Sequence, residues 1–138
     1  MKRAGFTMIE LIFVIVILGI LAAVAIPKLA ATRTDAAATS ALSDFKTVMK
    51  DIQTDAMSTG ALKANLIDTT TASPNVVANG TGISVMGGGV ICAAVARTND
   101  VNVTITDGAG IGNAACALVA DAFVTGEIIT VLGSSVAR

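Results

Sequence analysis

The sequence predicts an α+β fold in which one long N-terminal helix packs on a small antiparallel β-sheet. Residues 11–26 contain no polar or charged side chain, which is typical of a membrane-spanning or fully buried helix. Residues 28–60 are rich in alanine and charge and contain no proline or glycine before Gly60. Residues 61–138 contain short β-prone runs separated by turn-forming residues. We therefore expect a helix over 6–27, its amphipathic continuation over 28–60, and a β-rich domain over 61–138.

The composition excludes several functional classes. The chain of 138 residues has room for one modest domain, and it contains no histidine. Without histidine, the commonest general base, the usual metal ligand and every His-containing triad are missing. The two cysteines do not have zinc-ligand spacing, and no basic run is interleaved with aromatic residues. We expect no enzymatic activity, no metal, no cofactor and no direct nucleic-acid binding.

The segment 6–26 has the length of a membrane span. At the helical rise it covers about 30 Å, the thickness of a bilayer core. A secretory signal peptide has a shorter apolar region, of roughly 7–15 residues. A signal-peptidase site is nevertheless present at residues 23–25, and its use would give a mature protein that starts at Ile26. The alternative function is therefore a membrane-anchored or Sec-exported binding protein that uses this segment only for targeting.

Glu10 is the one charged residue within the apolar segment. A carboxylate at mid-bilayer costs about 2.5–3.5 kcal/mol, whereas each Leu, Ile, Val or Phe contributes about 0.3–0.6 kcal/mol in favour of insertion. Residues 11–26 contain twelve of these apolar side chains, so insertion is favoured despite the charge. Thr7 and Glu10 also have the spacing of a capping box, in which the two residues satisfy free backbone donors at a helix start.

The stretch GFTMIELIFVIVILGILAAVAIPKL resembles the N-terminal signature of type IV pilins and type II secretion pseudopilins. The resemblance covers about the first thirty residues. It implies that residues 1–5 are a leader, that a prepilin peptidase cuts after Gly5, and that the same enzyme N-methylates Phe6. It also assigns Glu10, Gly19 and Pro27 to filament assembly. Removal of the leader would leave seven basic against ten acidic side chains.

Gly19 and Pro27 weaken the predicted helix. Proline lacks the amide proton that a helix interior needs and clashes with the carbonyl of Ala23, and glycine lowers helix propensity. In the isolated subunit these residues predict a mild kink. The resemblance implies a stretch that unwinds when subunits pack into a filament.

The segment 28–60 carries one apolar stripe at helical spacing. Gly60, after two small polar residues, is a plausible helix stop. We expect the β-rich domain to pack on this stripe, which consists of Leu42, Phe45, Met49, Ile52 and Ala56.

The β-prone runs of the C-terminal part are separated by short turn signals such as Asn79-Gly80 and the triple glycine at 87–89. The run 101–106 alternates polar and apolar residues, so one face of that strand should meet water. These patterns predict an antiparallel meander with strands at 76–77, 83–86, 90–96, 101–106 and 128–132.

Cys92 and Cys116 are expected to form a disulfide. A small, aromatic-poor core commonly needs a covalent link, and disulfides persist outside the cytoplasm. The alternative is a pair of buried free thiols. Asp100, Asp107 and Asp121 lie near predicted turns, but no run matches a calcium loop, so solvated aspartates are the preferred interpretation.

The sequence thus favours a structural filament subunit. Three settings fit it: a type IV pilus, a type II secretion pseudopilus and a competence pilus for DNA uptake. The expected partners are identical or related pilin subunits, the prepilin peptidase and an inner-membrane assembly platform. The expected location is the inner membrane, as a single-pass protein with its C-terminal domain in the periplasm, and afterwards the filament.

Overall fold

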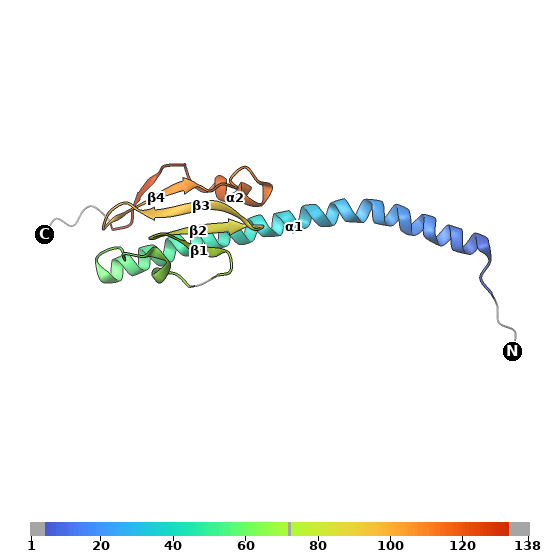
Figure 1. Cartoon of the computed structure of the whole chain (residues 1–138), viewed down its shortest axis with the longest axis horizontal. Helices are drawn as coiled ribbons and strands as arrows, with labels where there is room; N and C mark the ends of the chain where they lie inside the picture. Colours follow the sequence, from blue (N-terminus) through green and yellow to red (C-terminus); the bar gives the residue numbers. More distant parts are fainter. Residues whose placement is uncertain (1–4, 72, 133–138) are drawn as a thin grey trace. The chain divides into compact units, whose positions relative to one another are not determined.

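The computed structural model describes residues 5–71 and 73–132, which form two compact units that meet between Arg33 and Thr34. The first helix runs through both units. The elements in chain order are α1 (Met8–Thr59), a 3₁₀ turn (Leu66–Thr69), β1 (Val76–Asn79), β2 (Gly82–Gly87), β3 (Val90–Arg97), β4 (Asn102–Asp107), a second 3₁₀ turn (Ala114–Cys116), α2 (Ala117–Ala120) and β5 (Ile128–Thr130) (Figure 1).

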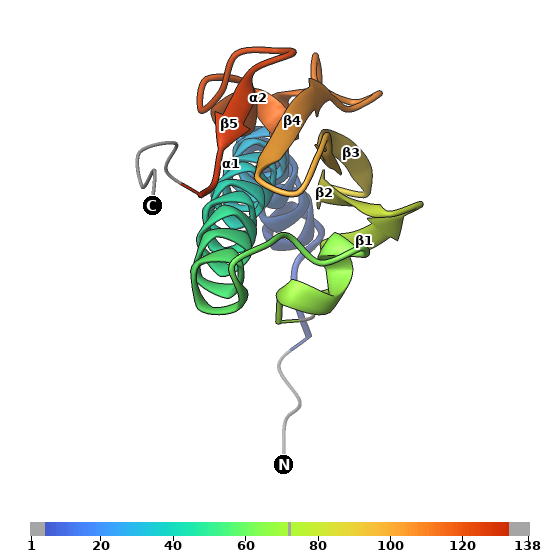
Figure 2. The ribbon, with the colours of Figure 1, turned by 90° about the vertical axis from the view of Figure 1, so that its left-hand side faces the viewer.

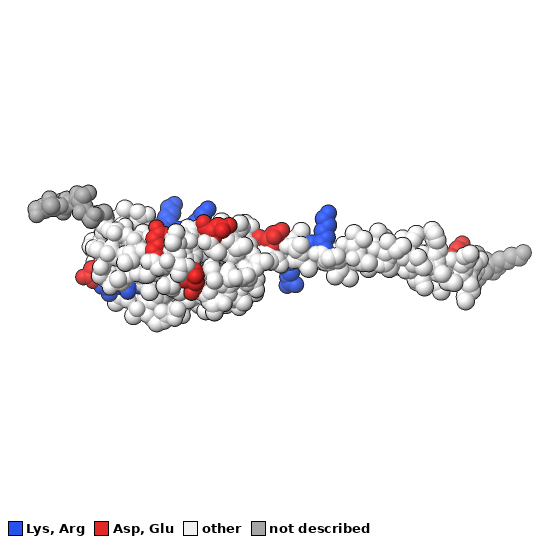
Figure 3. Space-filling model, turned by 90° about the horizontal axis from the view of Figure 1, so that it is seen from above, with Lys and Arg blue, Asp and Glu red and all other residues white. Residues whose placement is uncertain are grey.

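The first unit is the N-terminal part of α1. Its helix continues through Pro27 without a break in the assigned helix. The apolar side chains of this part are exposed, as Leu11 at 58% and Ile26 at 68% illustrate. Figure 3 shows a long surface on this part of the chain with almost no charged side chain on the face drawn. The described residues of this unit, 5–33, therefore form no hydrophobic core of their own.

The second unit is an antiparallel sheet packed on the C-terminal part of α1, so the predicted α+β class is confirmed. The strand order is β1-β2-β3-β4-β5, a simple meander. Viewed along α1, the strands curve around one side of the helix, with β1 and β5 at the two ends of the sheet (Figure 2). All five predicted strands are present, with boundaries that differ by at most two residues.

The end of α1 lies where the sequence predicts it. Gly60 has φ +81°, a left-handed conformation that glycine adopts without steric cost. Its amide donates to the Ala56 carbonyl at 2.8 Å, which satisfies one of the free carbonyls of the last turn. The chain then turns back toward the sheet, and Leu62 is buried.

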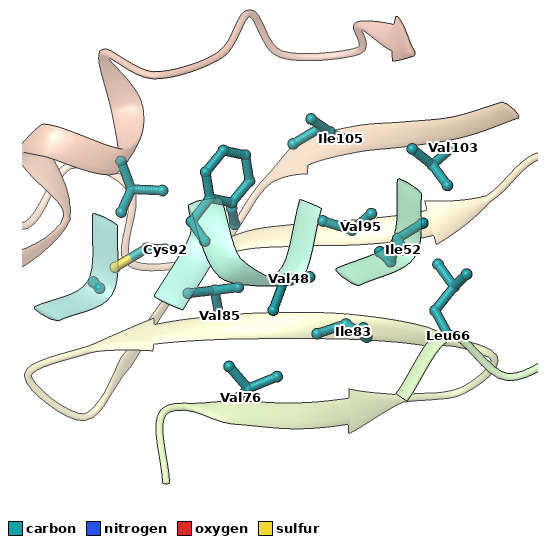
Figure 4. Packing of buried hydrophobic residues seen from close by; sticks show 14 of the residues in the cluster. Val48, Ile52, Leu66, Val76, Ile83, Val85, Cys92, Val95, Val103 and Ile105 are labelled. Atoms are coloured by element: carbon teal, nitrogen blue, oxygen red, sulfur yellow. The ribbon is translucent and has the colours of Figure 1, made fainter. Parts of the chain in front are cut away.

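The core lies between α1 and the sheet, and its helix face differs from the predicted stripe. Phe45, Ile52 and Ala56 are buried as expected, but Leu42 and Met49 are only partly buried. The centre of the contact is formed by Val48 with small alanines, which let the sheet approach the helix closely. Figure 4 shows Val48 and Ile52 among core side chains of β2, β3 and β4. The buried residues of α1 are Ala38, Ala41, Phe45, Val48, Ile52 and Ala56.

Two aspartates of α1 fix the segment that leads to β1. Asp51 Oδ2 accepts hydrogen bonds from the Thr70 hydroxyl at 2.9 Å and the Thr71 amide at 3.3 Å. Asp44 Oδ2 accepts from Asn75 Nδ2 at 2.8 Å. Through these hydrogen bonds, Asp44 and Asp51 help to hold the segment that leads to β1 on the helix α1.

Candidate functional site

The predicted cleavage position lies in an exposed, non-helical stretch. Gly5 and Phe6 precede α1, which begins at Met8, and Phe6 is 92% exposed. No atom lies within 4 Å of the position that a Cβ on Gly5 would occupy. Exposed chain with small residues is the preferred substrate of proteolysis. Residues 1–4 of the expected leader lie outside the described residues.

Thr7 and Glu10 form the predicted capping box. Glu10 Oε2 accepts hydrogen bonds from the Thr7 amide at 2.8 Å and from the Thr7 hydroxyl at 2.7 Å. In return, the Glu10 amide donates to Thr7 Oγ1 at 3.3 Å. The carboxylate is thus held in one orientation at the start of α1.

The capping box uses only one of the two carboxylate oxygens of Glu10. Among the described residues, Glu10 Oε1 accepts no hydrogen bond, while Oε2 takes both donors of Thr7. A carboxylate has about four acceptor positions on its two oxygens. Glu10 can therefore cap its own helix and bind a cation of another molecule at the same time. The spacing of Thr7 and Glu10 predicts the capping role, the family resemblance implies a role in assembly, and this geometry allows both.

Gly19 and Pro27 lie within the continuous helix of the first unit. Gly19 is exposed, and a Cβ there would meet no atom within 4 Å. No tertiary contact within the described part of the chain therefore explains the glycine at this position. Unwinding between Gly19 and Pro27 on assembly stays a prediction.

The apolar side chains of the first unit are exposed, and their removal from water requires a membrane or another molecule. Among the described residues, α1 alone is long and apolar enough to cross a membrane. Its uncharged stretch ends at Lys28, and Arg33 follows within two turns. Such a boundary between apolar and charged residues is typical of the end of a span.

Cys92 and Cys116 form a disulfide in the second unit. The two residues are 24 positions apart, their Cα atoms are 5.1 Å apart, and both are buried. Cys92 belongs to β3, and Cys116 ends the second 3₁₀ turn. The bond joins the sheet to the segment between β4 and β5, which contains the second 3₁₀ turn and α2. Neither of these two elements was predicted from the sequence.

The three turn aspartates do not come together. Asp100 pairs with Arg97, and Asp107 accepts a hydrogen bond from the Thr125 hydroxyl. Asp121 is exposed at the end of α2. Within residues 5–71 and 73–132, no group of three or more Cys, Asp or Glu side chains is arranged to hold a metal ion.

The arrangement is pilin-like: an exposed apolar half-helix with one capping carboxylate is continued by a half-helix that packs on a small antiparallel sheet. Residues 1–26 match the family described as the prokaryotic N-terminal methylation motif. The chain thus carries the processing signature of type IV pilins and pseudopilins, and the predicted resemblance is confirmed over this segment. No curated protein and no solved structure matches the chain.

Proposed function

We propose that this protein is a structural subunit of a type IV pilin-like filament and has no catalytic activity of its own. Prepilin peptidase removes residues 1–5, and the new N-terminal residue Phe6 is methylated. The observation that carries this proposal is the N-terminal unit itself. It presents an uninterrupted apolar helix with a single carboxylate, Glu10, four residues after the expected mature start.

The same helix serves two environments in turn. In the inner membrane its apolar side chains face lipid, and in the filament they pack against other copies of the helix. Both settings remove the exposed apolar surface from water, which is favourable at about 25 cal/mol per Å². The charged groups of the helix start are the exception, because desolvation of an unpaired charge is costly.

The free oxygen of Glu10 gives these charges a partner. Cleavage creates an amine at Phe6, and Glu10 Oε2 is already bound to Thr7 of its own chain. Glu10 Oε1 then binds the Phe6 amine of a neighbouring subunit. This pairing compensates both buried charges and sets the register in which one subunit docks on the next.

The filament is a type IV pilus, a secretion pseudopilus or a competence pilus. The disulfide near the C-terminus favours a pilus, whereas the short and plain second unit favours a major pseudopilin. In each setting the partners are identical or related subunits, the prepilin peptidase and an inner-membrane assembly platform. The second unit faces the periplasm before assembly.

The test is the mature N-terminus together with the assembly product. In cells with a working prepilin peptidase and assembly platform, mass spectrometry should find chain 6–138 with one methyl group on Phe6, and electron microscopy should find filaments that contain it. A mature start at Ile26 would support an exported protein instead. Retention of residues 1–5 in such cells would contradict the proposal.

A further inference from the structure

An apolar groove runs between α1 and β5 in the second unit. Its volume is about 300 Å³. Phe45 and Met49 line it from α1, and Ile129 and Val131 line it from β5 and the residue that follows. β5 is the last strand of the sheet order in the described part of the chain, so the sheet does not continue over this groove.

Two lysines border this α1–β5 groove. Lys46 and Lys50 are exposed and lie one turn apart on α1, and both line the groove. Neither side chain makes an ion pair or a hydrogen bond to the residues that the structure describes. An apolar groove bordered by two free ammonium groups fits an apolar side chain that is flanked by carboxylates.

The chain itself presents such a surface on residues 121–128, here named the acidic turn. Val124 and Ile128 are 72% and 59% exposed, and Asp121 and Glu127 are exposed beside them. No ion pair to another described residue neutralises either carboxylate. The acidic turn therefore combines exposed apolar side chains with unpaired carboxylates, the two properties that fit the groove and its lysines.

The acidic turn is held in a defined shape. The Glu127 amide donates to the Val124 carbonyl at 2.9 Å, which closes a four-residue turn. Gly126 has φ +79° at its third position, as a type II turn requires. The Gly126 amide also donates to Ile105 of β4 at 2.8 Å. Because this turn is already ordered, docking costs little additional conformational entropy.

We propose that the acidic turn of one copy of this chain docks in the α1–β5 groove of the next copy. The residues that line the groove and the exposed residues of the acidic turn do not overlap, although Phe123 of the turn packs on Phe45 with ring centroids 5.5 Å apart. The contact is therefore heterologous, and its repetition produces a ring or an open helical filament. The proposal rests on the function proposed above and adds a contact between second units to the contact between N-terminal helices. Charge complementarity selects a second copy as the occupant, because Lys46 and Lys50 meet Asp121 and Glu127.

Zero-length cross-linking tests this contact on the full chain. Detergent-extracted protein is mixed from ¹⁵N-labelled and unlabelled preparations, and a carbodiimide couples amines to carboxylates that touch. We expect mixed-isotope cross-links from Lys46 or Lys50 to Asp121 or Glu127, with a yield that falls at least fivefold from low to high salt. Cross-links from these lysines only to other carboxylates, or only within one copy, would overturn the proposal.

Charge reversal gives a second, independent test in filament-forming cells. Lys46→Glu with Lys50→Glu should lower the filament yield at least tenfold, and so should Asp121→Lys with Glu127→Lys. The chain that carries all four changes should recover most of the yield, because the attraction returns with opposite signs.

A charge reversal outside both surfaces is the control. Asp68→Lys changes the net charge by half as much as either double reversal, and Asp68 is exposed on the first 3₁₀ turn. We expect normal filaments from Asp68→Lys. Normal filaments from both double reversals would overturn the docking proposal and leave the filament function intact. A wild-type chain that forms no filaments would contradict the filament function, and cross-linking then decides the docking alone.

Discussion

Glu10→Gln separates the capping role of Glu10 from its proposed pairing with the Phe6 amine more sharply than Glu10→Ala does. Glutamine at this position of a capping box also accepts the hydrogen bond of the N-cap amide. The contact between the Thr7 amide and Glu10 Oε2, 2.8 Å long, therefore has an equivalent in the variant. Only the negative charge is lost. The variant keeps the start of α1 and removes the proposed partner of the Phe6 amine.

The capping role and the pairing role predict different losses of free energy for Glu10→Gln. If Glu10 acts only as a cap, the substitution changes the free energy of the helix by less than about 1 kcal/mol, which is less than a tenfold effect. If Glu10 pairs with a buried amine, removal of the charge costs about 3–5 kcal/mol per subunit contact. At about 1.4 kcal/mol per tenfold, the subunit contact weakens by roughly two to three and a half orders of magnitude.

The assay is filament yield by electron microscopy at matched membrane levels of wild type and variant. Mass spectrometry of the N-terminus first establishes that the variant is cleaved and methylated. We expect a processed, membrane-resident Glu10→Gln protein with few or no filaments, and a partial defect for Glu10→Asp because its reach is shorter. Glu10→Ala should insert into the membrane at least as well as wild type. Abundant normal filaments from Glu10→Gln would refute the pairing.

Three further predictions concern processing and the second unit. Gly5→Trp should leave the precursor uncut in the membrane, because the scissile bond must approach the peptidase closely; efficient cleavage on an immunoblot would contradict this. Unreduced, denatured protein should show no reactive thiol, and loss of the Cys92–Cys116 bond should lower the free energy of unfolding by about 3–4 kcal/mol in the chain-entropy model; two thiols by mass-shift labelling would end this prediction. Gly87→Ala should lower the urea midpoint of the detergent-extracted full chain, since its Cβ would lie 2.6 Å from the Ala115 carbonyl oxygen and 2.9 Å from Cys92 Sγ. Gly112→Ala, whose Cβ would meet no atom within 4 Å, is the matched control and should leave the midpoint unchanged within error.

The regular elements could be read from the sequence because each has a strong local cause. Gly60 ends α1 through its backbone conformation, and the alternation of residues 101–106 gives β4 its buried Val103 and Ile105. The connection from β4 to β5 has no comparable signal. Its 3₁₀ turn is short, with Asn113 Oδ1 accepting from the Ala115 amide at 3.0 Å, and the buried Cys116 belongs to it. Such a segment takes its shape from what it packs against.

The sequence by itself determined the processing signature, the membrane-length helix, the capping partners Thr7 and Glu10, and the order of the strands. All of these depend on residues that are close in the chain, where spacing and composition carry the physical information. The sequence also predicted that Phe45, Ile52 and Ala56 are buried, but only the tertiary structure decided that Ala38, Ala41 and Val48 share that face of α1. Alanine is weakly hydrophobic, so Ala38 and Ala41 gave no signal, although small residues are what lets the sheet approach the helix. The α1–β5 groove was equally invisible, because Lys46 and Ile129 are more than eighty residues apart and meet only when the sheet curves around the helix.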